Sequence, residues 1–149
     1  MSNFAIVFPG QGSQSVGMLG ALAAAHPEVA ATFAEASEAL GDDLWELTCN
    51  GPEDRLNQTD RTQPAMLAAG VAVWRVWKTC GGPDPVYMAG HSLGEYTALV
   101  CAGALDYAEA VRAVARRGRL MQEAVPEGKG GLAAILGLDD STIEQLCAE

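Results

Sequence analysis

Apolar and polar positions along the chain alternate in blocks that predict strands and helices in turn. Short apolar runs over residues 3–8, 86–90 and 132–137 predict three strands of the kind buried in parallel sheets. The stretches between them are rich in helix-forming residues. We expect helices over 18–40 with a break at His26-Pro27, within 42–56, over 65–79 after Gln63 and Pro64, over 91–104 and 106–125, and from Ser141 onward. This alternation predicts an α/β fold with a parallel sheet.

The composition excludes several classes of protein. The chain is 49% hydrophobic and 19% charged, which argues against a disordered or fibrous protein. Its formal charge of −10 argues against a general nucleic-acid binder, because phosphates require a basic face. No apolar stretch approaches the roughly 20 residues of a membrane span, and the first residues do not resemble a signal peptide. We therefore expect a cytoplasmic protein without a membrane segment.

The four cysteines do not suggest a metal centre or a disulfide framework. Cys49, Cys80, Cys101 and Cys147 form no C-x-x-C pair, and only two histidines could join them as ligands. We expect reduced thiols and no bound metal.

The segment Gly90-His91-Ser92-Leu93-Gly94 has the pattern G-x-S-x-G between a predicted strand and a predicted helix. Glycines on both sides allow close backbone approach, so the chain can turn sharply and hold the Ser92 hydroxyl out. The free N–H groups of the helix start then face the place where an oxyanion would form after attack on an acyl carbon. Ser92 is thus either a nucleophile or the first residue of an ordinary strand–helix turn.

A second glycine-rich loop, residues 9–14, follows the first predicted strand. Met18 stands where a phosphate-binding P-loop requires lysine, and no glycine follows Gly12 at the spacing of a dinucleotide site. The loop is therefore either a plain turn or the source of a second oxyanion donor, the backbone N–H of Gln11.

The helix over 106–125 carries one arginine close to its apolar face. Helical spacing places Tyr107, Val111, Val114, Gly118, Met121 and Val125 on one stripe. The same spacing predicts that Arg112, Arg116 and Arg119 are solvated. Arg117 lies beside the stripe, so it should be partly buried and should need an anionic partner. That partner is either an internal carboxylate or the carboxylate of a substrate.

Five motifs taken together resemble the malonyl-CoA:acyl carrier protein transacylases of bacterial fatty-acid synthesis. They are F-P-G-Q-G-S-Q from Phe8, T-Q-P-A from Thr62, G-H-S-L-G-E from Gly90, Arg117-Gly118, and Q-E-A-V-P-E-G from Gln122. The resemblance implies an α/β-hydrolase-like acyltransferase core, truncated here, over residues 1–127. It also implies that a small ferredoxin-like subdomain begins within 128–149.

The resemblance also implies roles for individual residues. Ser92 would be the nucleophile, and the backbone N–H groups of Gln11 and Leu93 would form the oxyanion hole. Arg117 would bind the malonyl carboxylate, and Gln63 would line the site. The substrates would be malonyl-CoA and the phosphopantetheine thiol of acyl carrier protein, with no permanently bound cofactor.

The general base of this family is not found in the sequence. The family's histidine follows the serine much later in the chain, whereas residues 93–149 contain none. A predicted capping box at Ser141 and Glu144 also starts a helix that reaches the end of the chain without a C-cap. We expect an N-terminal portion that carries the nucleophile and lacks efficient turnover alone.

Other interpretations remain open from the sequence. A serine esterase or thioesterase would share the elbow but has no need for Arg117, and an acyltransferase module of polyketide synthesis would share more of the motifs. A third interpretation is a non-catalytic half-domain that binds acyl carrier protein through a basic patch. The patch consists of Arg112, Arg116, Arg117, Arg119 and Lys129, which otherwise form a solvated face.

Overall fold

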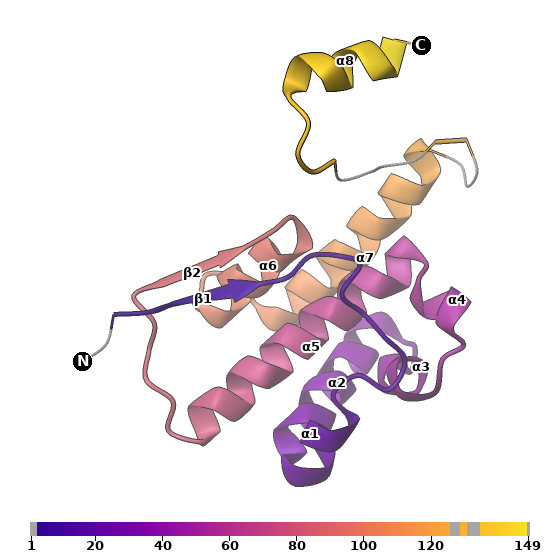
Figure 1. Ribbon diagram of the computed structural model, residues 1–149. Coiled ribbons are helices and arrows are strands. Elements are labelled where there is room, and N and C mark those ends of the chain that lie inside the picture. The colour runs from indigo at the N-terminus through magenta and orange to yellow at the C-terminus, as the bar shows by residue number, and fades with distance from the viewer. Residues whose placement is uncertain (1–2, 126–128, 131–134, 149) are drawn as a thin grey trace.

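A computed structural model describes residues 3–125, 129–130 and 135–148 (Figure 1). The elements run in this order: β1 (Ala5–Phe8), α1 (Gly20–Ala25), α2 (Pro27–Leu40), α3 (Leu44–Asn50), α4 (Glu53–Leu56), α5 (Thr59–Thr79), β2 (Tyr87–Gly90), α6 (Leu93–Cys101), α7 (Tyr107–Ala124) and α8 (Asp140–Ala148). The alternation of strands and helices is the α/β arrangement expected from the sequence.

The two strands form a parallel pair, in register from Ala5 opposite Tyr87 to Phe8 opposite Gly90. The crossover between them passes through α1 to α5, so both strands end at the same edge, beside the start of α6 (Figure 1). Part of the third expected strand, over 132–137, lies outside the described residues, and positions 135–137 are not a strand.

The core lies among the helices. The long helix α5 packs against α2, α6 and α7, and its apolar residues from Ala65 to Val76 meet Phe33, Val111 and Val114 there. Tyr107 closes one end of this core, where its hydroxyl donates to the Thr32 carbonyl at 3.1 Å. Helix packing therefore supplies the apolar interior of the described structure.

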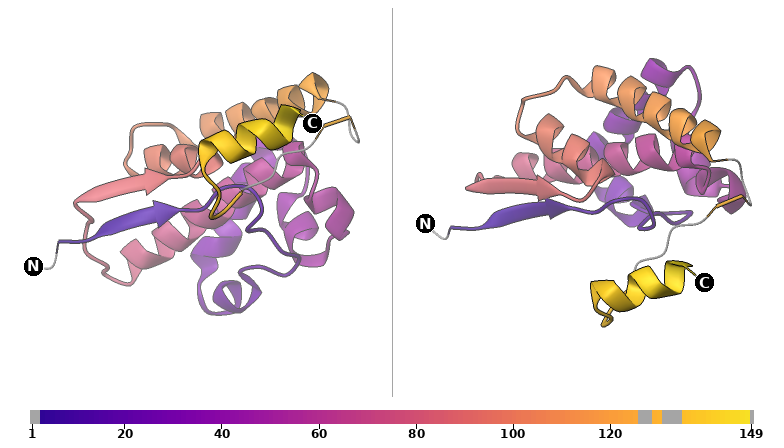
Figure 2. Two further views of the ribbon diagram at one scale, coloured as in Figure 1. Left: turned by 45° about the horizontal axis from the view of Figure 1, so that its top comes forward. Right: turned by 90° about the horizontal axis from the view of Figure 1, so that it is seen from above.

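The expectation that both strands are buried is wrong for this chain. Val7 and Tyr87 are each 73% exposed, whereas Phe8 is buried against the helices. The helices cover one face of the sheet, and no described element covers the other face or the outer strand edges (Figure 2). An apolar sequence shows that a strand can be buried, but the strand is buried only where another element packs against it.

Helix α5 begins earlier than its proline suggests. We expected the helix to follow Pro64, but it starts at Thr59 and contains Pro64 in its second turn. Proline at this position lacks the N–H that would bond to the carbonyl four residues back, so the helix loses one backbone hydrogen bond there. The Thr62 hydroxyl donates to the Leu56 carbonyl at 2.6 Å, which ties this first turn to the end of α4.

Helix α8 begins differently from the predicted capping box. The helix starts at Asp140, and the Asp139 carboxylate accepts bonds from the N–H and hydroxyl of Thr142, both at 2.9 Å. An aspartate side chain thus takes the capping role predicted for Ser141. Helix α8 lies apart from the packed helices in both figures.

Across the described ranges, no helix combines the length and the apolar character needed to cross a bilayer.

Candidate active site

The turn between β2 and α6 is a strained elbow. Ser92 has φ 52° and ψ −105°, an uncommon conformation for a residue other than glycine. A Cβ on Gly90 would collide with the backbone of Gly94, and a Cβ on Gly94 would collide with the Phe8 carbonyl. The two glycines therefore let the start of α6 lie against both strands, as the pattern predicted.

Three of the predicted site residues meet at this elbow. The exposed hydroxyl of Ser92 accepts a hydrogen bond from Arg117 Nη2 at 2.9 Å. Arg117 Nη1 donates to Gln63 Oε1 at 2.9 Å, and the amide nitrogen of Gln63 donates to Met121 Sδ at 3.2 Å. The side chains come from α7, α5 and the residue before α6, so only the fold brings them together.

A close approach of α5 and α7 supports this arrangement. A Cβ on Gly118 would lie 2.6 Å from both the Thr59 carbonyl oxygen and the Asp60 Cα. Glycine at position 118 therefore lets the two helix backbones nearly touch. The next residue back, Arg117, is thereby placed beside Gln63.

The half-buried guanidinium of Arg117 is surrounded by neutral groups. Within the described residues it takes part in no ion pair, so the internal salt bridge considered from the sequence has no partner there. Its other neighbour is the Tyr96 ring, with the guanidinium carbon 5.8 Å from the ring centroid. The positive charge is thus uncompensated locally and suited to a ligand's anionic group.

Within the part of the chain that the structure describes, the backbone N–H groups of both predicted oxyanion donors are free. Leu93 is the first residue of α6, so its N–H has no acceptor within the helix. Among the described residues, neither the Leu93 nor the Gln11 backbone N–H makes a hydrogen bond. The loop that carries Gln11 lies beside the elbow, since a Cβ on Gly10 would be 2.9 Å from the His91 carbonyl oxygen.

Neither histidine of the chain is bonded to the Ser92 hydroxyl within the described ranges. The His91 ring lies against the glycine-rich loop, with Nδ1 2.9 Å from a Cβ placed on Gly10. His26 precedes α2 at its junction with α1. The described site therefore holds a serine, a cation, a buried amide and free N–H groups, and its only bonded partner for the serine is Arg117.

The expected apolar stripe of α7 is confirmed over part of its length. Tyr107, Val111, Val114 and Gly118 are buried, and Arg112, Arg116 and Arg119 are exposed. The stripe was wrong at its end, where Met121 is 46% and Val125 is 53% exposed. The end of helix α7 extends beyond the packed helices (Figure 1), and these two side chains are only partly covered.

Sequence reasoning missed two contacts of the site. Tyr96 follows Ser92 by four residues and faces Arg117, a spacing that helix geometry would have flagged. Met121 was assigned to the core, but its sulfur accepts a bond from Gln63. No sequence signal pointed to that contact, because its partners are 58 positions apart.

In the part of the chain that the structure describes, the thiols and carboxylates form no metal-binding cluster. Burial raises the pKa of the Cys101 thiol to about 12. No group of three or more His, Cys, Asp or Glu side chains among these residues is arranged to hold a metal ion.

A parallel strand, a strained serine turn and a following helix define the α/β enzymes that work through a serine nucleophile. Residues 5–148 match the family model described as acyl transferase domain, and the chain belongs to that family.

The chain is similar to known members along its whole length. It is 64% identical, over all of its 149 residues, to a malonyl CoA-acyl carrier protein transacylase of Salmonella typhimurium, of which it covers 48%. A solved structure of such a transacylase from Coxiella burnetii is 57% identical with a TM-score of 0.94, covering 99% of this chain and 46% of that one. The chain thus spans about half the length of the relatives that it matches.

Another solved structure is a malonyl-transacylase in complex with a type II PKS acyl-carrier protein. It is 61% identical to this chain with a TM-score of 0.93, and the matched region covers 99% of this chain and 48% of the transacylase.

Proposed function

We propose that the intact protein carrying this chain transfers a malonyl group from malonyl-CoA to the phosphopantetheine thiol of acyl carrier protein. The observation that carries the proposal is the 2.9 Å contact between the Ser92 hydroxyl and Arg117. A nucleophile beside a locally uncompensated cation suits an acyl group that has a free carboxylate. The transacylases to which this chain is similar support the assignment.

The proposed reaction has two half-reactions through an ester of Ser92. Ser92 Oγ attacks the thioester carbonyl, its proton passes to a base, and coenzyme A leaves with a proton returned to sulfur. The carrier thiol then attacks the ester by the same steps in reverse. The backbone N–H groups of Gln11 and Leu93 would hold the oxyanion, and one such donor contributes roughly 3–4 kcal/mol.

In this proposal Arg117 selects the acyl group. Only one methylene separates the malonyl carboxylate from the ester carbonyl, so a guanidinium that reaches Ser92 Oγ also reaches the carboxylate. Gln63 Oε1 would hold Nη1 while Nη2 turns from the hydroxyl to the carboxylate. An acetyl group would leave the half-buried cation without a partner, which disfavours it.

The remaining parts of the proposal concern the whole protein. The base would come from a segment outside residues 1–149, because no histidine follows Ser92, and this chain alone would not turn over. No cofactor is needed, since Ser92 itself carries the acyl group. We place the reaction in the cytoplasm, because the negative charge of coenzyme A thioesters prevents them from crossing a membrane.

Two further expectations belong to the same proposal. Residues 1–127 would belong to the acyltransferase core and 128–149 would begin a ferredoxin-like subdomain, in keeping with the separation of α8 from the packed helices. The exposed guanidinium groups of Arg112, Arg116 and Arg119 on α7 would attract an acidic carrier protein.

The test separates acylation from transfer. Radiolabelled malonyl-CoA given to the intact protein without carrier should leave the label on Ser92, located by mass spectrometry, and not on a Ser92→Ala variant. Added carrier protein should then remove the label as a thioester. Release of free malonate would indicate a thioesterase, absence of label would contradict the proposal, and preference for a polyketide carrier would indicate the polyketide alternative.

A further inference from the structure

We propose that Asn57 is a positioning residue that orients the Gln11 backbone amide through the side chain of Gln14. The inference rests on the proposed function, in which that amide is an oxyanion donor. Asn57 lies between α4 and α5, 46 positions from Gln11 in the chain, and no motif of the sequence singled it out.

Two hydrogen bonds connect Asn57 to the glycine-rich loop. Gln14 Nε2 donates to Asn57 Oδ1 at 2.8 Å, and Gln14 Oε1 accepts from the Gly12 backbone N–H at 2.8 Å. Both ends of the Gln14 amide are therefore used. A turn of this amide about its last side-chain bond would break both hydrogen bonds at once, so Asn57 sets its orientation.

The bond to Gly12 controls the peptide next to the Gln11 amide. The Gly12 N–H belongs to the peptide plane that follows Gln11, and Gly12 has φ +105°, a conformation that glycine tolerates. On the other side, the Gly10 backbone lies tightly against His91. With the chain held both before and after Gln11, the direction of its N–H is determined.

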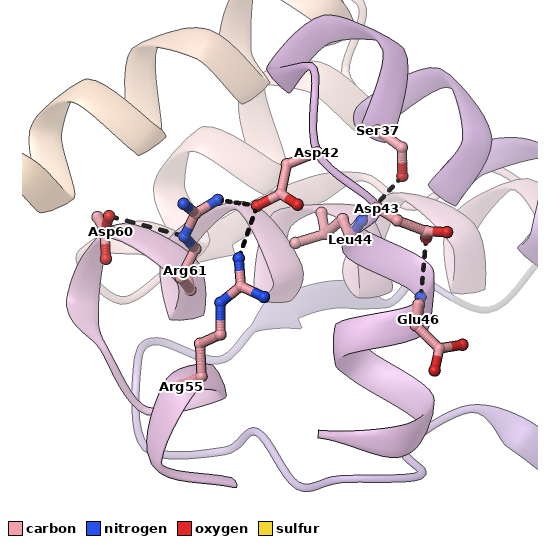
Figure 3. Close-up of polar contacts among 8 residues, drawn as sticks. All are labelled: Ser37, Asp42, Asp43, Leu44, Glu46, Arg55, Asp60 and Arg61. Atoms are coloured by element: carbon pink, nitrogen blue, oxygen red, sulfur yellow. Dashed lines mark hydrogen bonds and ion pairs between the residues drawn. The ribbon is translucent and has the colours of Figure 1, made fainter. Parts of the chain in front are cut away.

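The turn that carries Asn57 is itself anchored. The Asp42 carboxylate pairs with Arg55 Nη2 of α4 at 3.2 Å and with Arg61 Nη1 of α5, so it joins the two helices that flank the turn (Figure 3). At the start of α5, Thr59 Oγ1 accepts a bond from the Gln11 side chain at 3.2 Å. The glycine-rich loop is thus bonded to a segment whose two flanking helices, α4 and α5, are joined by the ion pairs of Asp42.

Because these bonds are exposed, their removal should affect catalysis more than stability. An exposed hydrogen bond contributes little net stability, since water replaces it. Oxyanion stabilisation, by contrast, depends steeply on the direction of the donor. A misdirected Gln11 N–H should therefore slow acylation without weakening the binding of malonyl-CoA.

The experiment measures single-turnover acylation of Ser92 by malonyl-CoA in the intact protein. We expect Asn57→Ala to lower the maximal acylation rate about tenfold, a fraction of the roughly 10²–10³-fold loss of a whole donor. The concentration of malonyl-CoA for half-maximal rate and the melting temperature should stay unchanged. Asn57→Asp, which keeps an oxygen acceptor for Gln14 Nε2, should restore most of the rate.

The matched control is Asn50→Ala. Asn50 is another exposed asparagine, and its side chain donates from Nδ2 to Glu46 Oε2 at 2.9 Å. This bond does not involve the glycine-rich loop or the elbow at Ser92. Its replacement should leave acylation unchanged. An equal loss in this variant, or no rescue by Asn57→Asp, would overturn the positioning role in favour of a general effect on the fold.

A double-variant cycle gives an independent check. In Gln14→Glu the carboxylate can still accept from Gly12, and the Asn57 amide can turn to donate to it. The double variant Gln14→Glu with Asn57→Asp places two carboxylates side by side with no hydrogen-bond donor between them. The fold-loss in its acylation rate should therefore exceed the product of the fold-losses of the two single variants. Additive effects would contradict the inference.

Failure of this inference differs from failure of the proposed function. If the parent protein forms no malonyl ester on Ser92, the proposed function falls. If the parent is acylated and Asn57→Ala is acylated at the parental rate, only the role of Asn57 falls.

Discussion

Arg117 of α7 donates a hydrogen bond at 2.9 Å to the hydroxyl of Ser92, which immediately precedes α6 and lies 25 positions away in the chain. The contact places a positive charge next to the oxygen that would attack the substrate. A positive charge there would stabilise negative charge on the serine oxygen, and under the proposed function it would lie within reach of the carboxylate of the acyl group that the serine receives.

Replacing Arg117 should change the acyl preference of the intact protein. We expect Arg117→Ala to lower kcat/KM for malonyl-CoA by about 100-fold, or about 3 kcal/mol, and to affect acetyl-CoA much less, because only malonyl loses a charged partner. Arg117→Lys should recover part of the loss, since it keeps the charge but not the two-pronged geometry. Unchanged discrimination between malonyl-CoA and acetyl-CoA would contradict the role of Arg117.

Giving Gln63 a charge should create a competitor for the substrate. Gln63 is fully buried and its Oε1 already accepts from Arg117, so Gln63→Glu would place a carboxylate against the guanidinium. We expect KM for malonyl-CoA to rise by about tenfold, with little change for acetyl-CoA. Steady-state kinetics with both thioesters tests this, and an equal change for both would point to a packing defect.

Adding one methyl group at Gly118 should separate α5 from α7. The new Cβ would lie 2.6 Å from backbone atoms of Thr59 and Asp60, which cannot move aside as a side chain could. We expect Gly118→Ala to lower the free energy of unfolding by about 1–3 kcal/mol in urea titrations, despite the better helix propensity of alanine. Gly20→Ala is the control, because nothing lies within 4 Å of a Cβ there, and it should not destabilise.

The cap of α8 should be sensitive to acid. Hydrogen bonds from the Ser141 hydroxyl and from Thr142 lower the pKa of Asp139 to about 2, below its usual value of 3.8. A lowered pKa in the folded state means that the cap stabilises α8 above about pH 3.8 and is lost as the pH falls through about 2. An NMR titration of the Asp139 carboxyl and the Thr142 amide measures this, and an ordinary aspartate pKa would contradict the cap.

Features that depend on neighbouring residues could be predicted from the sequence. Asp106 caps α7, as expected, by accepting from the Glu109 N–H at 2.9 Å. The elbow at Ser92 was also predictable, because its two glycines and its serine act within five consecutive positions. Such signals are reliable because backbone sterics and capping bonds act over a few residues.

Features that depend on packing were predicted less well. Gln63 was expected before a helix, but it lies inside α5, where the tie from Thr62 to Leu56 and the packed core outweigh the proline signal. The exposure of Val7 and Tyr87 was missed because it depends on which elements cover the sheet.

The sequence by itself determined the α/β pattern, the serine elbow, the place of Arg117 beside an apolar stripe and the resemblance to acyltransferases. All of these depend on local spacing or on motifs. Only the tertiary structure decided that Arg117 contacts Ser92 and Gln63, and that Asn57 holds the glycine-rich loop through Gln14. These contacts join residues between 25 and 54 positions apart, and their distances depend on how closely the helices and loops pack.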